Sequence, residues 1–190
     1  MRIVLAEDSL AWLGGTQTYT LTVAEQLQRL AHDVLITTRE QGVASELAAE
    51  RGLRVLTLDE LPDEPAVALT QDAEIAYELA RRRPQWPQVI VVHSDIFDIH
   101  LPPAVPQLRA AIALYDRVER RLRAMDLGCP AVRLGQPVDV ERFKPSAPLR
   151  ERDPVVLLLG NYVQGERLAL IEAGCAHAGL QLRHVGVHGE

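Results

Sequence analysis

Residues 2–36 read RIVLAEDSLAWLGGTQTYTLTVAEQLQRLAHDVLI, and this stretch decides the fold class. Residues 3–6 form a short continuous apolar run, which is typical of a parallel strand covered on both faces. After a loop over residues 7–15, side chains recur at helical spacing at Thr20, Val23, Ala24, Leu27 and Leu30. Residues 34–36 are a second apolar run. Strand, loop, helix and strand in this order predict the beginning of an α/β domain with a parallel sheet.

The same alternation continues along the chain. Further strands are predicted at residues 53–58, 89–92, 110–114 and 131–134. The helices between them are marked by a short segment at 46–51, by Ile75, Leu79 and Ala80, and by Val118, Leu122 and Met125. Prolines at 62 and 65 break the chain before the second of these helices, and residues 96–106, with three prolines, are expected to be loop or broken helix. The predicted fold class is a Rossmann-like, doubly wound parallel sheet.

Composition divides the chain into three segments. Residues 1–135 are expected to form the Rossmann-like domain, and residues 136–153, rich in proline and charge, are expected to form a linker. Residues 154–190 contain a strand at 155–159, expected to be buried, then a helix and a strand at 182–187. One βαβ unit is too small for a core of its own, so we expect the chain to stop partway into a second domain.

Overall composition is that of an ordinary globular protein and excludes several classes. The chain has 190 residues, of which 47% are apolar and 24% charged, and a formal charge of −6. Nucleic-acid binding is not expected, because it requires a positively charged surface and this chain is acidic overall. No signal-peptide core and no apolar stretch of about 18 residues is found, which predicts a soluble, cytoplasmic protein.

Cysteine and histidine usage predicts no metal site. Cys129 and Cys175 have no nearby cysteine partner and are expected to be buried free thiols. The histidines other than His93 lack ligand spacing. We therefore expect neither a metal nor a cofactor.

The polar loops point to a ligand site at one edge of the sheet. Ligands of doubly wound sheets bind outside the carboxyl ends of the strands, where the strand order reverses. With residues 3–6 and 89–92 as neighbouring strands, the loops that meet there are residues 7–15 and 93–98. These loops hold the most suggestive glycine and polar residues of the chain.

Gly14 and Gly15 stand immediately before a helix expected to begin near Thr16. Glycines allow a ligand to approach the backbone, and the free N–H groups of a first helical turn attract an anion such as phosphate. The alternative is that the two glycines only form a tight turn, since no GxGxxG motif is present.

His93, Ser94 and Asp95 follow the strand at 89–92 directly. A neutral imidazole can hydrogen-bond to a sugar hydroxyl, and a protonated one can face a phosphate. A structural role is the alternative for His93. Asp95 could contact a ligand hydroxyl, whereas capping of the next turn is the favoured role for Ser94.

An arginine-rich helix is predicted over residues 116–123. It could contact an anionic lipid or a phosphorylated acceptor at a membrane surface, but a solvated face with Glu119 interspersed is the favoured interpretation.

Several segments together resemble one enzyme family. Residues 14–16 (Gly-Gly-Thr), 23–27 (Val-Ala-Glu-Gln-Leu) and 31–34 (Ala-His-Asp-Val) resemble the opening of the family-4-type GT-B glycosyltransferases. Residues 89–94 are similar to that family's strand ending in His-Ser. Residues 135–145, Gly-Gln-Pro-Val-Asp followed by Phe-Lys-Pro, resemble its Asn-Gly-Val-Asp and Phe-x-Pro segment.

The resemblance implies the acceptor-side half of a hexosyltransferase-type enzyme that uses a nucleotide-sugar donor. It implies that Gly14, Gly15 and Thr16 contact the donor diphosphate. It implies that His93 contacts the transferring sugar or the acceptor, with Ser94, Asp95 and Tyr115 as further sugar contacts. The acceptor would be a glycan, a lipid or a small molecule. Catalysis would then rest on orientation and on fixed donors around the departing diphosphate.

The sequence departs from the family at several positions. Asn161 stands where an arginine is usual and Gln164 where a lysine is usual, and each loss removes a charge-assisted contact of about 1.5–3 kcal/mol. Tyr115 precedes Asp116 where Ser-Glu is usual. The family's two donor-binding glutamates have no counterpart, so we do not expect turnover by this chain alone.

Three hypotheses follow from these observations. The first is the half-enzyme, and the second is a non-catalytic module that binds a glycan or a partner chain. The third, a nucleotide-binding oxidoreductase, is disfavoured because the first strand is not followed by GxGxxG. An apolar edge on residues 154–190 would favour a homodimer.

Overall fold

The computed structural model describes residues 1–145, 147–148, 151, 153–160 and 163–186. The chain forms two compact units, residues 1–139 and residues 140–190, and each is described on its own.

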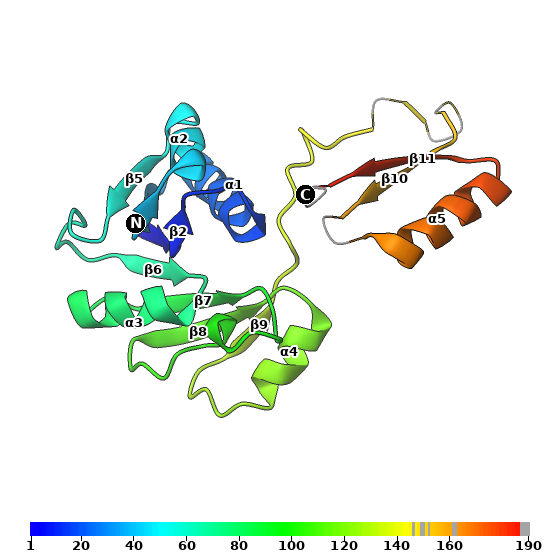
Figure 1. Cartoon of the computed structure of the whole chain (residues 1–190). Helices are drawn as coiled ribbons and strands as arrows, with labels where there is room; N and C mark the ends of the chain where they lie inside the picture. Colours follow the sequence, from blue (N-terminus) through cyan, green and yellow to red (C-terminus); the bar gives the residue numbers. More distant parts are fainter. Residues whose placement is uncertain (146, 149–150, 152, 161–162, 187–190) are drawn as a thin grey trace. The chain divides into compact units, whose positions relative to one another are not determined.

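The first unit is built on a seven-stranded sheet in which every pair of neighbouring strands is parallel (Figure 1). Its spatial order is β5-β3-β1-β6-β7-β8-β9. The bounds are β1 Arg2–Ala6, β3 Asp33–Thr38, β5 Arg54–Thr57, β6 Val67–Thr70, β7 Gln88–Val92, β8 Leu108–Ala113 and β9 Ala131–Arg133. This architecture confirms the predicted Rossmann-like, doubly wound sheet.

Helices cover both faces of this sheet. They are α1 (Gly15–Arg29), α2 (Val43–Glu50), α3 (Ala73–Arg82) and α4 (Asp116–Arg123), with a short 3₁₀ helix η1 (Asp98–His100). Successive residues of a strand point to opposite faces. Leu5 accordingly packs in the cluster that includes α1 and α2, whereas Val4 packs in the cluster that includes Ile75 of α3. The apolar strands are therefore buried from both sides, as their continuous apolar runs predict.

Strand β6 was not predicted from the sequence, and the prediction that the strands at residues 3–6 and 89–92 are neighbours was wrong. β1 pairs with β6, and β7 lies one strand further out. β6 has four residues, Val-Ala-Leu-Thr, which follow two prolines and include only two large apolar side chains. Such a short segment has little apolar signal of its own. The reversal of strand order lies between β1 and β6, so the loop after β6 belongs to the ligand-binding edge.

A second small sheet, also missed, shapes the loop after β1. β2 (Ser9–Leu10) pairs in parallel with β4 (Glu40–Gln41). Gly42, which follows β4, lies against this loop so closely that an added Cβ would be 2.8 Å from the Cα and the carbonyl oxygen of Ala11. The N–H of Val43 donates to the same carbonyl at 3.1 Å. Only glycine permits this contact between α2 and the segment around Ala11.

The second unit is a single βαβ element. β10 (Val155–Leu159) and β11 (Gln181–Val185) are parallel and are connected by α5 (Gly165–His177). The expectation that residues 155–159 are buried was wrong, because Val155, Leu157 and Leu159 are 41%, 55% and 70% exposed. One helix covers only one face of a two-stranded sheet. The end of the strand expected at 182–187 lies outside the described residues.

We predict that Gly42→Ala lowers the free energy of unfolding of the first unit by about 1–3 kcal/mol, because its Cβ must displace backbone. Both tryptophans of the chain, Trp12 and Trp86, lie in this unit, so urea unfolding followed by tryptophan fluorescence reports on it. Gly15→Ala is the matched control, since a Cβ at Gly15 meets no heavy atom within 4 Å. Equal midpoints for the two variants would contradict the close contact at Ala11.

Candidate functional site

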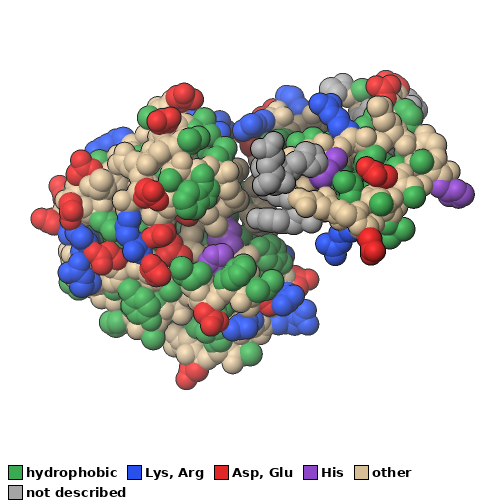
Figure 2. Space-filling view, in the orientation of Figure 1, with side chains coloured by type: hydrophobic (Ala, Val, Ile, Leu, Met, Phe, Trp, Pro, Cys, Tyr) green, Lys and Arg blue, Asp and Glu red, His purple; other side chains and the backbone are tan. Residues whose placement is uncertain are grey.

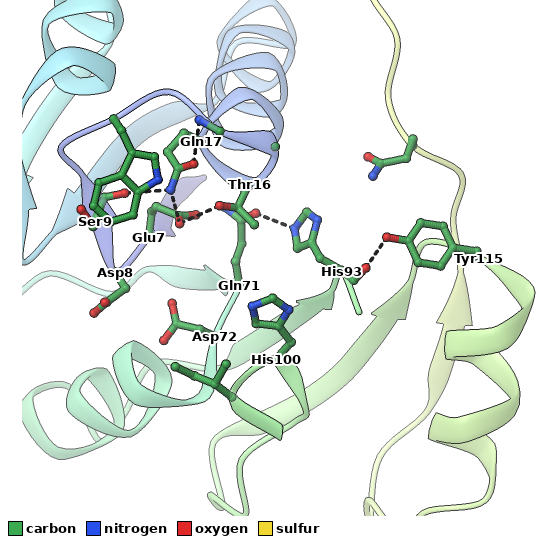
Figure 3. A pocket seen from close by; sticks show the side chains of 15 residues that line it. Glu7, Asp8, Ser9, Thr16, Gln17, Gln71, Asp72, His93, His100 and Tyr115 are labelled. Atoms are coloured by element: carbon green, nitrogen blue, oxygen red, sulfur yellow. Dashed lines mark hydrogen bonds between the residues drawn. The ribbon is translucent and has the colours of Figure 1, made fainter. Parts of the chain in front are cut away.

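A cavity of about 530 Å³ lies at the carboxyl edge of the sheet in the first unit (Figure 3). Its walls come from the ends of β1, β6 and β7, the beginning of α1, and η1. It is lined by Glu7, Asp8, Ser9, Trp12, Gly14, Gly15, Thr16, Gln17, Gln71, Asp72, His93, Ile99, His100, Tyr115 and Gln136. These lining residues include three carboxylates and no lysine or arginine. Figure 2 shows acidic and histidine side chains near one another on this unit.

Parallel pairing brings the chemistry-bearing residues to this edge. Glu7 follows β1, Gln71 and Asp72 follow β6, and His93 follows β7. The carboxyl ends of parallel strands share an edge of the sheet, so these residues converge although they are far apart in sequence.

Glu7 is the most buried carboxylate of the cavity and accepts several hydrogen bonds. Thr16 Oγ1 and Gln17 Nε2 both donate to Glu7 Oε1 at 3.0 Å, and Thr20 Oγ1 donates to Oε2 at 3.4 Å. Burial raises the pKa of Glu7 to about 7, against the opposing effect of the hydrogen bond from Thr16. Glu7 is therefore a carboxyl group that titrates near neutral pH.

The glycine loop leaves the beginning of α1 open. Gly14 is the N-cap residue of α1, and no side chain caps the first turn. The N–H of Gly14 donates to Gln17 Oε1 at 3.0 Å, which fixes the loop. An added Cβ at Gly15 would meet no heavy atom of the protein within 4 Å. Glycine at position 15 is thus not required by internal packing, and the N–H groups beside it remain available to a ligand.

His93 is held as a neutral imidazole. Its Nε2 lies 2.6 Å from Gln71 Oε1, and its ring packs edge-on against Tyr19 with centroids 5.0 Å apart. Burial, and secondarily the proximity of His100, lowers the pKa of His93 to about 4. At neutral pH the ring is therefore a hydrogen-bonding group for a hydroxyl, and it does not offer a positive charge to a phosphate.

Asp72 has a structural role as well as a place in the cavity. Its Oδ1 accepts the N–H of Ile75 at 2.9 Å and so caps α3. Burial raises the pKa of Asp72 to about 6, opposed by this backbone hydrogen bond. Asp8, at the same edge, forms an ion pair with Arg39 at 2.8 Å.

The structure brings together most of the residues expected at the site. Gly14, Gly15, Thr16, His93 and Tyr115 line the cavity. The Tyr115 hydroxyl donates to the backbone carbonyl of His93 and so holds the loop after β7.

Ser94 and Asp95 are not among the residues that line the cavity, and both interact locally. Ser94 Oγ accepts the N–H of Ile96 at 3.1 Å, the turn-capping arrangement favoured for it. Asp95 pairs with Arg117 at 2.6 Å. These contacts fix the loop after β7 around His93.

The cavity is also lined by residues that were not predicted from the sequence, among them Glu7, Gln17, Gln71 and Asp72. Glu7 was detectable, because it directly follows the first strand. Gln71 and Asp72 follow the strand that was itself missed. Gln17 lies inside a helix, and nothing in the sequence marks its side chain as directed toward Glu7.

Three of the four arginines of α4 face acidic neighbours. Arg117 pairs with Asp95, Arg123 with Glu119 at 2.6 Å, and Arg121 lies 3.7 Å from Asp98. Across the part of the chain that the structure describes, no helix is long and apolar enough to cross a membrane. The described residues also include no group of three His, Cys, Asp or Glu side chains placed to hold a metal ion.

Comparison with known proteins identifies the fold. No family model and no curated protein matches the sequence. HepE from Anabaena, solved with UDP and glucose, matches with a TM-score of 0.63 at 13% identity, over 100% of this chain and 70% of that one. A glycosyltransferase from Rickettsia africae matches with a TM-score of 0.67 at 14% identity, over 97% of this chain and 59% of that one. The lipopolysaccharide outer core galactosyltransferase WaaB matches at 0.58 and 11% identity, over 100% and 69%. Over 97–100% of its length the chain therefore has the fold of these glycosyltransferases, which is the GT-B fold that the sequence resemblance implies.

The raised pKa of Glu7 predicts a specific pH dependence of stability. The Glu7 pKa is 4.5 without the fold and about 7 within it, so the folded state binds this proton more tightly. The resulting stabilisation is complete below pH 4.5 and is lost as the pH rises through 7. Between about pH 5 and 8, wild type should lose about 2 kcal/mol relative to Glu7→Gln. Urea unfolding of both proteins across this range measures the difference, and parallel curves would contradict the shift.

Proposed function

We propose that this chain is the acceptor-side half of a GT-B glycosyltransferase that transfers a sugar from a nucleotide-sugar donor to an acceptor. In this proposal residues 136–153 are the linker and residues 154–190 begin the donor-binding domain. One observation supports it above all others: the cavity at the carboxyl edge combines hydroxyl-binding side chains with the uncapped beginning of α1.

The side chains of the cavity suit a polyhydroxylated ligand. Carboxylates accept hydrogen bonds from hydroxyls, amides and neutral imidazoles can accept or donate them, and Asp72, His93 and Gln136 line the cavity with such groups. Trp12 lines the same cavity with a side chain 58% exposed, so its ring is available to pack on the apolar face of a sugar. A volume of about 530 Å³ is typical of a small-molecule site.

The donor diphosphate would lie at the glycine loop. The N–H groups of the first turn of α1 attract an anion, and the absence of a Cβ at Gly15 allows phosphate oxygens to approach them. HepE, with a similar fold, has been solved with UDP-glucose as well as with UDP. Those complexes support a nucleotide-sugar as the ligand tested first.

His93 would contact a hydroxyl of the transferring sugar or of the acceptor. With Nε2 directed at Gln71, the ring nitrogen left for a ligand is Nδ1. The proposal requires no covalent nucleophile from this half. Its residues orient two hydroxylated ligands and stabilise the leaving diphosphate with fixed N–H donors.

A second candidate function is a non-catalytic module of the same fold that binds a glycan or a partner chain. It is favoured by Gln164, the N-cap residue of α5, at the position where the family resemblance implies a lysine. Asn161, where the resemblance implies an arginine, lies outside the described residues. The two candidates differ in whether the chain binds a nucleotide-sugar.

We predict that the purified chain binds UDP or UDP-glucose and that Gly15→Val weakens this binding at least tenfold. The valine side chain would occupy the space that phosphate oxygens need, while meeting no heavy atom of the protein at its Cβ. Isothermal calorimetry measures both affinities. Thr22→Val is the matched control, because it places valine on the same helix at a half-buried residue that does not line the cavity.

Absence of UDP and UDP-glucose binding by a folded wild-type chain would count against the half-enzyme. Binding of a free glycan without either nucleotide would favour the non-catalytic module. Equal affinity of wild type and Gly15→Val would exclude the glycine loop as the phosphate site.

We also predict that Trp12→Ala weakens glycan binding about fivefold, since a lost aromatic packing contact costs about 1 kcal/mol. Trp12→Phe should keep most of the affinity, because it retains an aromatic face. Saturation-transfer NMR with a panel of mono- and disaccharides ranks the three proteins. An unchanged affinity for Trp12→Ala would place the sugar elsewhere.

A further inference from the structure

Four side chains form a hydrogen-bonded network between the first strand and His93. Thr20 Oγ1 lies 3.4 Å from Glu7 Oε2, Gln71 Nε2 contacts Thr20 Oγ1, and His93 Nε2 lies 2.6 Å from Gln71 Oε1. The Glu7–His93 network therefore connects the end of β1, helix α1, the end of β6 and the end of β7. Figure 3 shows its link between Gln71 and His93. Glu7, Thr20 and Gln71 are 5%, 0% and 3% exposed, so solvent does not compete for these bonds.

The chemistry of Glu7 sets the direction of every bond in this network. An ionised carboxylate only accepts, so the Thr20 hydroxyl donates its single proton to Glu7. The Thr20 oxygen is then left to accept from Gln71, which must present its NH₂ group there. The Gln71 carbonyl oxygen consequently faces His93. Because a carbonyl oxygen can only accept a hydrogen bond, the ring nitrogen that faces it must carry the proton.

We infer that Glu7, Thr20 and Gln71 are positioning residues that hold His93 in the tautomer with the proton on Nε2 and the lone pair on Nδ1. The inference rests on the proposed function in one respect, namely that His93 meets a sugar hydroxyl. In this tautomer His93 accepts a hydrogen bond from that hydroxyl. In the opposite tautomer it would donate one, and the ring would discriminate differently between ligand groups.

Contacts around the His93 ring restrict its orientation. Tyr19 packs edge-on against the imidazole, and the Tyr115 hydroxyl holds the His93 carbonyl. At the other end of the network, Gln17 Nε2 donates both to Glu7 Oε1 and to the Ser9 carbonyl at 2.9 Å. The Glu7 carboxylate is therefore oriented by groups outside the network, and the ring is held in place while its tautomer is selected.

The test is the tautomer of His93 in the full chain, read by ¹⁵N-histidine long-range NMR at about pH 8, where Glu7 is ionised. His93→Gln assigns the signal among the six histidines. Wild type should show a protonated Nε2 and an unprotonated Nδ1. Thr20→Val, which keeps the branched shape and removes the hydroxyl, should shift the population toward the opposite tautomer.

Two matched variants separate this effect from a loss of packing. Thr20→Ser restores the hydroxyl and should return the wild-type pattern. Thr22→Val removes a hydroxyl from the same helix, one that donates to the Thr18 carbonyl at 2.8 Å outside the network, and should leave His93 unchanged. Gln71→Met breaks the network at its other link and serves as the test if Thr20→Val does not fold.

Ligand binding supplies the second readout. The dissociation constant for UDP-glucose or a bound glycan should rise in Thr20→Val by the factor by which the Nε2-protonated population falls, about twofold for equal tautomers. A wild-type His93 protonated on Nδ1, or a Thr20→Val spectrum identical to wild type, would overturn the inference. The predicted tautomer in a wild-type chain that binds neither sugar nor nucleotide would support the network and reject the proposed function.

Discussion

The parallel pairing of β1 with β6 is the constraint on which the candidate site depends. In this register Ala6 lies opposite Thr70, so the residues that leave the sheet next are Glu7 and Gln71. Thr70 lies opposite Ile90 of β7, which brings His93 to the same edge three residues further on. Three loops that are distant in sequence thereby supply adjacent polar side chains. Displacement of β6 by one residue would turn its side chains to the other face and separate Gln71 from both Thr20 and His93.

Burial of Glu7 beside the beginning of α1 is the second physical feature of the site. A buried carboxylate is costly unless donors satisfy it, and here the donors are side chains, those of Thr16, Gln17 and Thr20. Because Gly14 has no side chain and no other side chain caps α1, the backbone N–H groups of the first turn are not used for this purpose. Side chains of α1 can therefore donate to the Glu7 carboxylate while the backbone N–H groups of its first turn bind an external anion.

The sequence predicted much of the fold, since that depends on local patterns. The continuous apolar runs at β1, β3, β7 and β8 and the helical spacing in α1 are strong signals for segments buried by their neighbours. β6 was not predicted because four residues that include Ala and Thr have little apolar pattern of their own. This strand is stabilised by pairing with β1 and β7, which occurs only in the folded chain. The site was predictable where it followed a recognised strand, as for His93, or a glycine pair, as for Gly14 and Gly15. The Glu7–His93 network was not predictable, because Thr20 sits within an apolar helix face and Gln71, which connects it to His93, follows a strand that the sequence did not reveal.

The charge distribution of the cavity favours one of the two ligands that the proposed sugar transfer requires. Lysine and arginine are absent from the residues that line it, and the nearby Arg39 pairs with Asp8 and with Glu74 at 3.2 Å. His93 is neutral at physiological pH, since its pKa is about 4. A diphosphate in this half would then be bound by backbone N–H groups and the helix dipole alone, each a weaker partner than a guanidinium. Binding a sugar hydroxyl requires no positively charged side chain, because carboxylates, amides and a neutral imidazole all form hydrogen bonds with hydroxyls. The lining of the cavity is therefore better matched to a sugar than to a phosphate, as the proposed acceptor-side role requires.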